Sequence, residues 1–192
     1  ESMFYHIPGL KLAMPSTPYD AKGLLKSAIR SDEPVVFLEH KLLYMDKGPV
    51  PEDEYLVEFG KANIRRPGRD VTLIAWSRMA SVCMEAAEQL ASEGVDAEVI
   101  DLRTLVPLDR EAILQSVKKT EHVVVVQEAV RRGGVASDIA AMIQSEAFDY
   151  LDAPIQIVAG INSPVPFNLN LEKQVIPRVE DVAAAARKAG YR

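Results

Sequence analysis

GLKLAMPSTPYDAKGLLKSAIR, residues 9–30, is the stretch of sequence that decides the fold. An apolar run at residues 10–14 predicts a strand, a Pro-Ser-Thr-Pro turn follows it, and apolar residues then recur at helical spacing up to Ile29. A second apolar strand is expected at residues 35–38. Two strands joined by one helix run parallel and cannot cover their own faces, so this stretch is one β-α-β unit of a larger sheet.

Strands and helices alternate through the second half of the chain. Apolar runs predict strands at residues 71–76, 97–101, 122–127 and 155–158. Helices are expected from a Ser77 cap to a stop at Gly94, and over residues 109–117, 134–145 and 179–189. Four strands separated by helices predict an α/β fold, a mostly parallel sheet with helices on both faces and right-handed crossovers.

One change of composition divides the chain. Residues 46–54 are polar and rich in acids, residues 55–59 alternate apolar and polar side chains, and residues 65–69 are expected to form a basic turn. We therefore expect the end of a first domain at residues 1–45, a linker at 46–69 and a second domain at 70–192.

The composition excludes several classes of function. The 192 residues carry a formal net charge of −6, with Lys and Arg scattered among acids, so no nucleic acid partner is expected. The single cysteine, Cys83, excludes an intrachain disulfide framework and a cysteine-rich zinc site. No apolar run reaches the roughly 20 residues that span a bilayer, so no membrane partner is expected either. We expect a reducing compartment, the bacterial cytoplasm or the mitochondrial matrix.

Three motifs resemble a known family. EVIDLRTLVPLD at residues 98–109 is similar to a strand–turn–helix signature of the transketolase C-terminal domain. QEAVRRGG at 127–134 stands where relatives often have His-Glu-Ala-Pro and two glycines, and YLDAP at 150–154 adds to the match. Residues 1–45 resemble the end of a pyrimidine-binding domain. The chain thus resembles the C-terminal part of beta subunits of thiamine-diphosphate-dependent 2-oxoacid or acetoin dehydrogenases, the pyruvate dehydrogenase type.

The resemblance implies chemistry shared between two subunits. An alpha subunit would bind the diphosphate and magnesium, and the enzyme would decarboxylate a 2-oxoacid, or cleave acetoin, and pass the acyl unit to lipoate. In relatives, the carboxylate that activates thiamine diphosphate and a histidine that handles protons lie upstream of the segment matching Glu1. The histidine belongs to a His-Ser-Gln stretch. We therefore expect no catalytic and no cofactor-binding residue in this chain, which would be inactive alone.

The resemblance also implies a role in assembly. The expected partners are the alpha subunit, a second beta subunit and the subunit-binding domain of a lipoyl acyltransferase, which would dock at the last helix through acids such as Glu180 and Asp181 and through the chain end. Two alternatives stay open: another transketolase-like enzyme such as a deoxyxylulose-phosphate synthase, and a free-standing anion-binding or interaction module. YHIPGLK at residues 5–11 favours the two-subunit dehydrogenases.

One candidate site is a structural potassium ion. In relatives, carbonyl groups at a helix end and the following turn hold the ion, and an Ala-Ile pair contributes to it. Ala28 and Ile29 match that pair, whereas Ser31 and Glu33 stand where the relatives have Asp and Asn. Because carbonyl ligands do not depend on the side chain, the resemblance implies that the site can persist.

A second candidate is an anion site at Arg131, Arg132, Gly133 and Gly134, which follow a strand and open a helix. Free N–H groups, the helix dipole and two guanidinium groups favour an anion there. The alternative is a glycine turn that lets helix and strand pack closely. Gln127, just before this turn, cannot transfer protons as a histidine would.

The other conspicuous side chains have structural interpretations. His6 is expected to bond its own turn, Glu39-His40-Lys41 ends a strand and is expected at a subunit contact, His122 is expected to cap a strand, and Cys83 is expected in the core.

Overall fold

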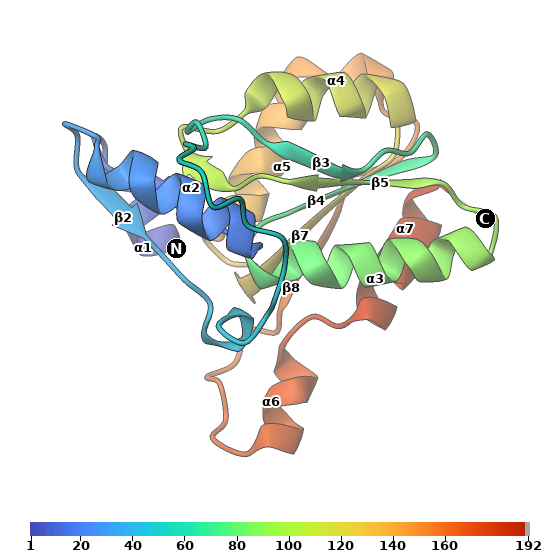
Figure 1. Ribbon diagram of the computed structural model, residues 1–192. Coiled ribbons are helices and arrows are strands. Elements are labelled where there is room, and N and C mark those ends of the chain that lie inside the picture. Colours follow the sequence, from blue (N-terminus) through green and yellow to red (C-terminus); the bar gives the residue numbers. More distant parts are fainter. Residues whose placement is uncertain (191–192) are drawn as a thin grey trace.

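The computed structural model describes residues 1–190 and contains two β-sheets (Figure 1). The larger sheet has five strands in the spatial order β3 (Asn63–Arg66), β5 (Ala97–Asp101), β4 (Val71–Ala75), β7 (Val123–Val130) and β8 (Gln156–Gly160). β5, β4, β7 and β8 are parallel, and β3 pairs antiparallel with β5. The four parallel strands lie where the sequence predicts strands, which confirms the mostly parallel α/β fold.

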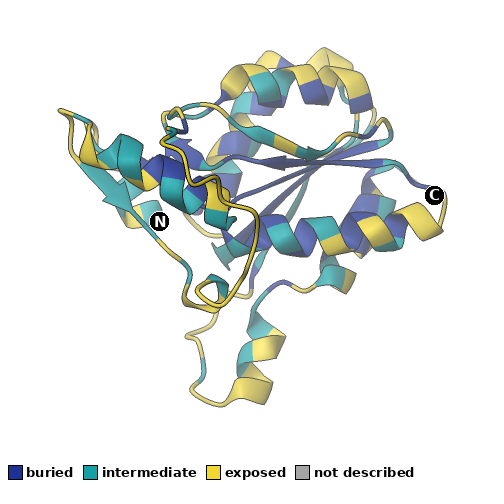
Figure 2. Cartoon of the chain, in the orientation of Figure 1, coloured by how far each residue is buried: buried dark blue, intermediate teal, exposed yellow. Residues whose placement is uncertain are grey.

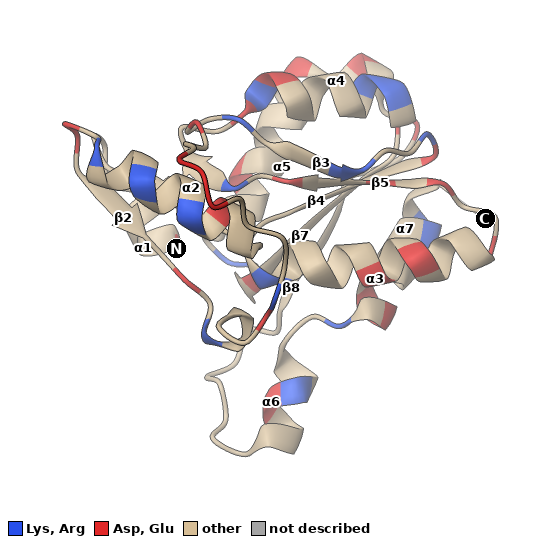
Figure 3. Cartoon of the chain, in the orientation of Figure 1, with Lys and Arg blue, Asp and Glu red and all other residues tan. Residues whose placement is uncertain are grey.

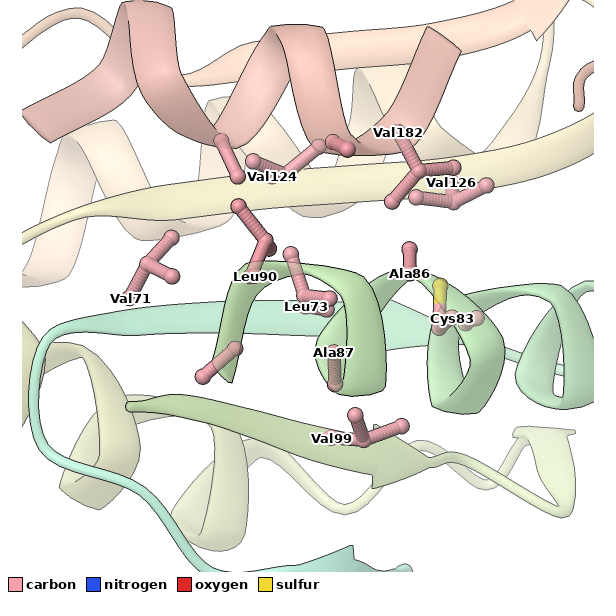
Figure 4. Close-up of a cluster of buried hydrophobic side chains, with 14 of the residues drawn as sticks. Val71, Leu73, Cys83, Ala86, Ala87, Leu90, Val99, Val124, Val126 and Val182 are labelled. Carbon is pink, nitrogen blue, oxygen red and sulfur yellow. The ribbon is translucent and has the colours of Figure 1, made fainter. Parts of the chain in front are cut away.

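Side chains of the central strand β4 alternate between two helical layers (Figure 1). Val71 and Leu73 pack in one core with α3 (Arg78–Ser92) and α7 (Val179–Gly190), which Figure 4 shows in close-up. Ile74 packs in the other core with α4 (Arg110–Thr120) and α5 (Val135–Glu146). Every residue of β4 and β5 is buried, as parallel strands between two helical layers require.

Two helix ends follow from particular residues. Asp109 caps α4, because its Oδ1 accepts the Ala112 N–H at 3.1 Å. Gly94 has φ +85° and ends the turn after α3, where the Val95 N–H reaches back to the Leu90 carbonyl at 3.0 Å. Ser77 holds the expected cap position of α3, but its side chain makes no capping hydrogen bond.

A smaller sheet joins the two halves of the chain. β1 (Lys11–Ala13) pairs parallel with β2 (Val35–Phe37), and α2 (Pro18–Ile29) connects the two strands as the sequence predicts. β1 also pairs antiparallel with β6 (Thr104–Val106), which belongs to the second half. The helix α1 (Ser2–Tyr5) precedes β1, and the 3₁₀ turn η1 (Lys41–Leu43) follows β2.

Three elements depart from the sequence-based prediction. The prediction of a basic turn at residues 65–69 is partly wrong, because β3 extends through Arg66 and only the residues after Arg66 form the turn. β3 is an edge strand with charged, mostly half-buried side chains, so it carries no apolar alternation. β6 has three residues, and α6 (Leu169–Val175) is a short helix with no buried residue. Such elements leave little periodic signal.

The segment between the two halves lies along α2. Gly23 allows this approach, since a Cβ there would come within 2.4 Å of Val57 Cγ2. The Tyr19 and Tyr55 rings stack with centroids 4.4 Å apart, and Ser27 Oγ donates to the Val57 carbonyl at 2.6 Å. Figure 3 shows the acid-rich segment running beside α2, which carries basic residues. The acidic charge of this segment is therefore opposite to the basic charge of the helix along which it lies.

Burial differs across the molecule. Figure 2 shows a five-stranded sheet whose central strands β5, β4 and β7 are mostly buried, a largely half-exposed first unit (residues 1–45), and an exposed segment around α6, which projects from the sheet in Figure 1. Phe167 and Leu169 in that segment are fully or largely exposed. None of the helices among residues 1–190 is both long and apolar enough to cross a membrane.

Candidate functional site

Three acids of the 98–109 motif link the elements that surround the junction between the two halves of the chain. Glu98 is buried and accepts hydrogen bonds from Ser116 Oγ and Lys119 Nζ. The second oxygen of the α4 cap residue, Asp109 Oδ2, accepts the Ala62 N–H at 2.8 Å. These contacts fix β5, α4 and the linker relative to one another, so each acid has a structural partner.

Asp101 lies at the centre of this junction and is fully buried. Its carboxylate accepts hydrogen bonds from Ser16 Oγ and, at 3.1 Å, from the Arg103 N–H. Burial raises the pKa of Asp101 to about 6, although the Ser16 hydrogen bond lowers it, and the nearby Asp20 carboxylate raises it further. The carboxyl group of Asp101 therefore titrates closer to neutral pH than an exposed aspartate does.

Asp20 and Arg103 form the ion pair that links α2 to the turn after β5. Arg103 Nη2 lies 2.7 Å from Asp20 Oδ1, and the two side chains are 14% and 1% exposed. Arg103 has φ +60°, a backbone conformation that costs a non-glycine residue free energy. The sequence predicts no role for Ser16, Asp20, Asp101 or Arg103. The only available signal was a charged residue at the end of an apolar strand.

His40 links the end of the first unit to strand β7. Its Nε2 lies 3.1 Å from Glu128 Oε1, and its Nδ1 is 3.2 Å from the Leu42 N–H. Because Nδ1 accepts that N–H, the ring proton is on Nε2 and is donated to Glu128. The structure therefore brings the predicted Glu39-His40-Lys41 segment to the second half of the chain, within this polypeptide.

The predicted anion turn is organised by Gln127. The Gln127 amide is fully buried, donates to the Ala129 and Val130 carbonyls at 3.1 and 2.7 Å, and accepts the Ala136 N–H at 2.8 Å. A Cβ at Gly134 would come within 2.0 Å of Gln127 Nε2. One N–H at the start of α5 is thus already bonded to protein.

The two arginines of this turn are exposed. Arg132 Nη2 donates to Asn162 Oδ1 at 3.2 Å, and Gly133 takes φ +66°. The close approach of Gly134 to Gln127 supports the packing interpretation, while both guanidinium groups lie at the surface. Anion binding at Arg131, Arg132, Gly133 and Gly134 stays a prediction.

Ala28 and Ile29, the predicted potassium ligands, end α2. The Ala28 carbonyl accepts the Ser31 N–H at 3.2 Å, which leaves one lone pair of that oxygen for another partner. Both residues lie at the end of a helix, where carbonyl groups lack intrahelical donors. Potassium binding there stays a prediction.

Cys83 and His122 take the structural positions expected of them, whereas the expected bond from the His6 side chain to its own turn stays a prediction. Cys83 is fully buried, and burial raises the pKa of its thiol. His122 Nδ1 lies 2.9 Å from the Thr120 carbonyl, next to the start of β7. His6 is exposed and ends α1, where its backbone N–H bonds the Ser2 carbonyl.

The last helix, α7, packs on the sheet through its apolar side chains, and its acidic residues lie outside the core. Val182 and Ala186 are among its buried residues, and Asp181 pairs with Arg178 at 3.2 Å. Glu180 and Asp181 lie in its first turn. Tyr191 and Arg192, the expected docking end, lie outside the described residues, so docking of an acyltransferase stays a prediction.

Comparison with known families matches both halves of the chain. The family described as "Transketolase, C-terminal domain" matches residues 60–182, and the one described as "Transketolase, pyrimidine binding domain" matches residues 1–47. A solved structure described as a split gene transketolase, inactive beta4 tetramer, is similar with a TM-score of 0.79 and 25% identity, over 98% of this chain and 59% of that one.

Curated relatives match almost the whole chain. The acetoin:2,6-dichlorophenolindophenol oxidoreductase subunit beta of Cupriavidus necator is 50% identical over 97% of this chain and 55% of that protein. The mitochondrial pyruvate dehydrogenase E1 component subunit beta-1 of Arabidopsis thaliana is 45% identical over 97% of this chain and 52% of that protein. The chain thus spans about half the length of these relatives.

Proposed function

The chain belongs to the transketolase family, and we propose that it is the C-terminal part of the beta subunit of a thiamine-diphosphate-dependent dehydrogenase. The complete enzyme would decarboxylate pyruvate or another 2-oxoacid, or cleave acetoin, and transfer the acyl unit to lipoate. The observation that carries this proposal is the 45–50% identity to pyruvate dehydrogenase and acetoin oxidoreductase beta subunits over nearly the whole chain. Relatives from bacteria and mitochondria support either the bacterial cytoplasm or the mitochondrial matrix.

The contacts of the 98–109 motif support a role in assembly. Asp101 bonds Ser16 of the first unit, Asp109 bonds Ala62 of the linker, and Glu98 bonds α4. In the complete enzyme, these contacts would hold the first unit at a fixed angle to the five-stranded sheet. Exposed apolar side chains such as Ile29 and Phe167 would then face the alpha subunit, a second beta subunit or the lipoyl acyltransferase.

Thiamine diphosphate, when bound to the complete enzyme, would supply the electron sink for cleaving the carbon–carbon bond beside a carbonyl group. Among residues 1–190, no group of three or more His, Cys, Asp and Glu side chains is arranged to hold a metal ion. We place the magnesium and the diphosphate on the alpha subunit. The role of this chain would be to orient and enclose that site.

Reconstitution tests the proposal. The chain is mixed with the alpha subunit encoded beside its gene, thiamine diphosphate, magnesium and either pyruvate or acetoin, with an artificial electron acceptor. We expect no turnover, whereas the complete reading frame that contains this chain restores turnover of one of the substrates. A complete assembly that turns over neither pyruvate, acetoin nor another 2-oxoacid would contradict the proposal. Synthesis of deoxyxylulose phosphate would establish the alternative enzyme.

A further inference from the structure

A cavity of about 370 Å³ lies at the carboxyl ends of β4, β7 and β8. Trp76 and Ser77 follow β4, Glu128 lies in β7, Gly160 ends β8, and Met79 comes from the first turn of α3. The volume falls within the range of small-molecule sites, roughly 300–1,000 Å³. The cavity is therefore large enough for a ligand of about the size of a phenylalkylamine.

The cavity lies where an open α/β sheet changes direction. From β4 the chain crosses to β5 on one side, and it later returns to β7 on the other side of β4. The crevice at such a point is where open α/β sheets bind ligands, because two neighbouring loops diverge there. The position of this cavity in the sheet makes it a candidate ligand site, and the side chains that line it indicate which ligand it binds.

Ser77 is a buried polar residue of this cavity whose side chain has no partner. The side chain of Ser77 lines the cavity, the residue is 5% exposed, and its Oγ has no hydrogen bond partner among residues 1–190. The backbone of Ser77 has φ +50° and ψ −141°, a conformation that serine rarely adopts. A hydroxyl held in this way is free to accept a hydrogen bond from a ligand.

Three acids line the cavity with Ser77, namely Glu1, Glu128 and Glu172, and the first two have buried carboxylate oxygens. His40 Nε2 lies 3.1 Å from both Glu128 oxygens and donates its one proton to that carboxylate, whereas Glu1 Oε1 is buried without a hydrogen bond among the described residues. Burial raises the pKa of Glu1, and the nearby Glu128 carboxylate raises it further. Glu1 Oε1 thus lacks a donor, and the Glu128 carboxylate has one donor for its two oxygens.

The positive charges nearby do not neutralise these acids. The Nδ1 atom of His40 accepts the Leu42 N–H, so the ring is neutral with its proton on Nε2. Arg78 lines the cavity, but it also lines the adjacent groove that contains Asp46, Glu85 and Glu180. In the cavity itself, three acids (Glu1, Glu128 and Glu172) stand beside one arginine, so carboxylate acceptors are in excess.

We propose that this cavity binds an organic cation, a primary ammonium group on a compact apolar body. The ammonium group would donate to Ser77 Oγ and to the carboxylate of Glu128, and the apolar body would pack against Trp76 and Met79. A metal ion is disfavoured, because the described residues contain no group of three or more His, Cys, Asp and Glu side chains that could hold one. This site does not depend on the proposed dehydrogenase function.

Trp76 provides a direct readout of binding. Trp76 is the only tryptophan in the sequence, is 2% exposed and lines the cavity. Its fluorescence, excited at 295 nm, roughly the red edge of tryptophan absorption, therefore reports on a ligand bound in the cavity. The chain is titrated with 2-phenylethylammonium, with the neutral isostere 2-phenylethanol and with phenylacetate. We expect the cation to bind at least about tenfold more tightly than the alcohol, because its hydrogen bonds are charge-assisted, and phenylacetate to bind least. Equal affinity for the alcohol, tighter binding of phenylacetate, or no binding of any probe would overturn the proposal.

Two variants locate the site. Glu128→Gln and Ser77→Gly are each expected to weaken 2-phenylethylammonium binding about tenfold, and glycine at position 77 accommodates φ +50° without strain. Glu88→Gln, an equal change of charge at an exposed position of α3, is the matched control and should leave the affinity unchanged. If Glu128→Gln lowers the unfolding temperature, its loss of binding is ambiguous, and the affinity of Ser77→Gly alone tests the assignment of the site. Unchanged affinity in Ser77→Gly, or equal loss in Glu88→Gln, would overturn the assignment.

Discussion

The five-stranded sheet and the smaller sheet both contain a β-α-β unit, yet they are buried to different extents. In the first, every residue of β4 is buried between α3, α7 and the opposite helical layer. In the second, no residue of β2 is fully buried, and Ile29 at the end of α2 is 75% exposed. Figure 2 shows the same contrast along the chain. Similar local patterns therefore produce a complete core in one region and a half-covered layer in the other.

The difference indicates which region depends on other protein. Apolar burial contributes roughly 25 cal/mol per Å², so a layer with exposed apolar side chains has little stability of its own. The smaller sheet is held by β6, by the segment lying on α2 and by the Asp20–Arg103 ion pair. We interpret the five-stranded sheet as the stable part and the first unit as the part that assembly completes.

Leu73→Ala is expected to have the largest effect on stability. Leu73 is fully buried in the core below β4, and deleting its side chain leaves a cavity that costs about 3 kcal/mol of the free energy of unfolding. Ile29→Ala in the first unit is the matched change and is expected to cost under about 0.5 kcal/mol, because that side chain is mostly exposed. Urea unfolding measures both values. Equal losses in the two variants would break the comparison.

Arg103→Met tests the link between the two regions. Removing the guanidinium leaves Asp20 buried without its partner, which is expected to cost about 3 kcal/mol, or slightly less because Arg103 is partly exposed. Arg69→Met is the control, since Arg69 also pairs with an aspartate but its side chain is 84% exposed, and we expect a loss of about 0.5 kcal/mol or less. A similar loss in both variants would show that the junction does not depend on the buried pair.

The raised pKa of Asp101 predicts how the stability of the chain depends on pH. Its pKa rises from 3.8 to about 6 on folding, so the folded state binds a proton more readily than the unfolded state between those values. The resulting stabilisation of the folded state amounts to about 2–3 kcal/mol. It is fully present below pH 4, roughly the pKa of Asp101 in the unfolded chain, and it is lost as the pH rises through about 6. We expect the stability of the native chain relative to Asp101→Asn to fall by this amount between about pH 4 and pH 7, as urea unfolding at several pH values would measure.

The pH experiment has its own control. Asp149 is exposed in the turn after α5, so Asp149→Asn should leave the pH dependence of the native chain unchanged. A flat difference between the native chain and Asp101→Asn across this range would contradict the buried position of the carboxyl group.

Phe167→Ser is expected to have the smallest effect on stability. Phe167 is fully exposed in the segment before α6, so its replacement should leave the free energy of unfolding within about 0.5 kcal/mol. If exposed apolar residues of this segment mediate self-association, the variant will sediment more slowly than the native chain at micromolar concentration. A native chain that sediments only as a monomer would contradict this expectation.

The sequence could predict the five-stranded region better than the junction. The strand at residues 97–101 was predicted with its observed limits, because continuous apolar runs and helical periodicity are local signals. β6 and the Asp20–Arg103 pair could not be predicted, since they join residues more than eighty positions apart in the sequence. Ser77 was expected to cap α3, but its side chain makes no capping hydrogen bond, which only its backbone dihedrals and unpaired hydroxyl reveal.

Native-state hydrogen exchange tests the contrast between the two regions most directly. Amide groups of β4, β5 and β7 should exchange only through global unfolding, whereas those of α2 and β2 should exchange at least about a hundredfold faster through local opening. Adding the alpha subunit should then slow exchange in α2 and β2 and leave β4 unchanged. Equal protection of the two sheets in the chain alone would contradict the account.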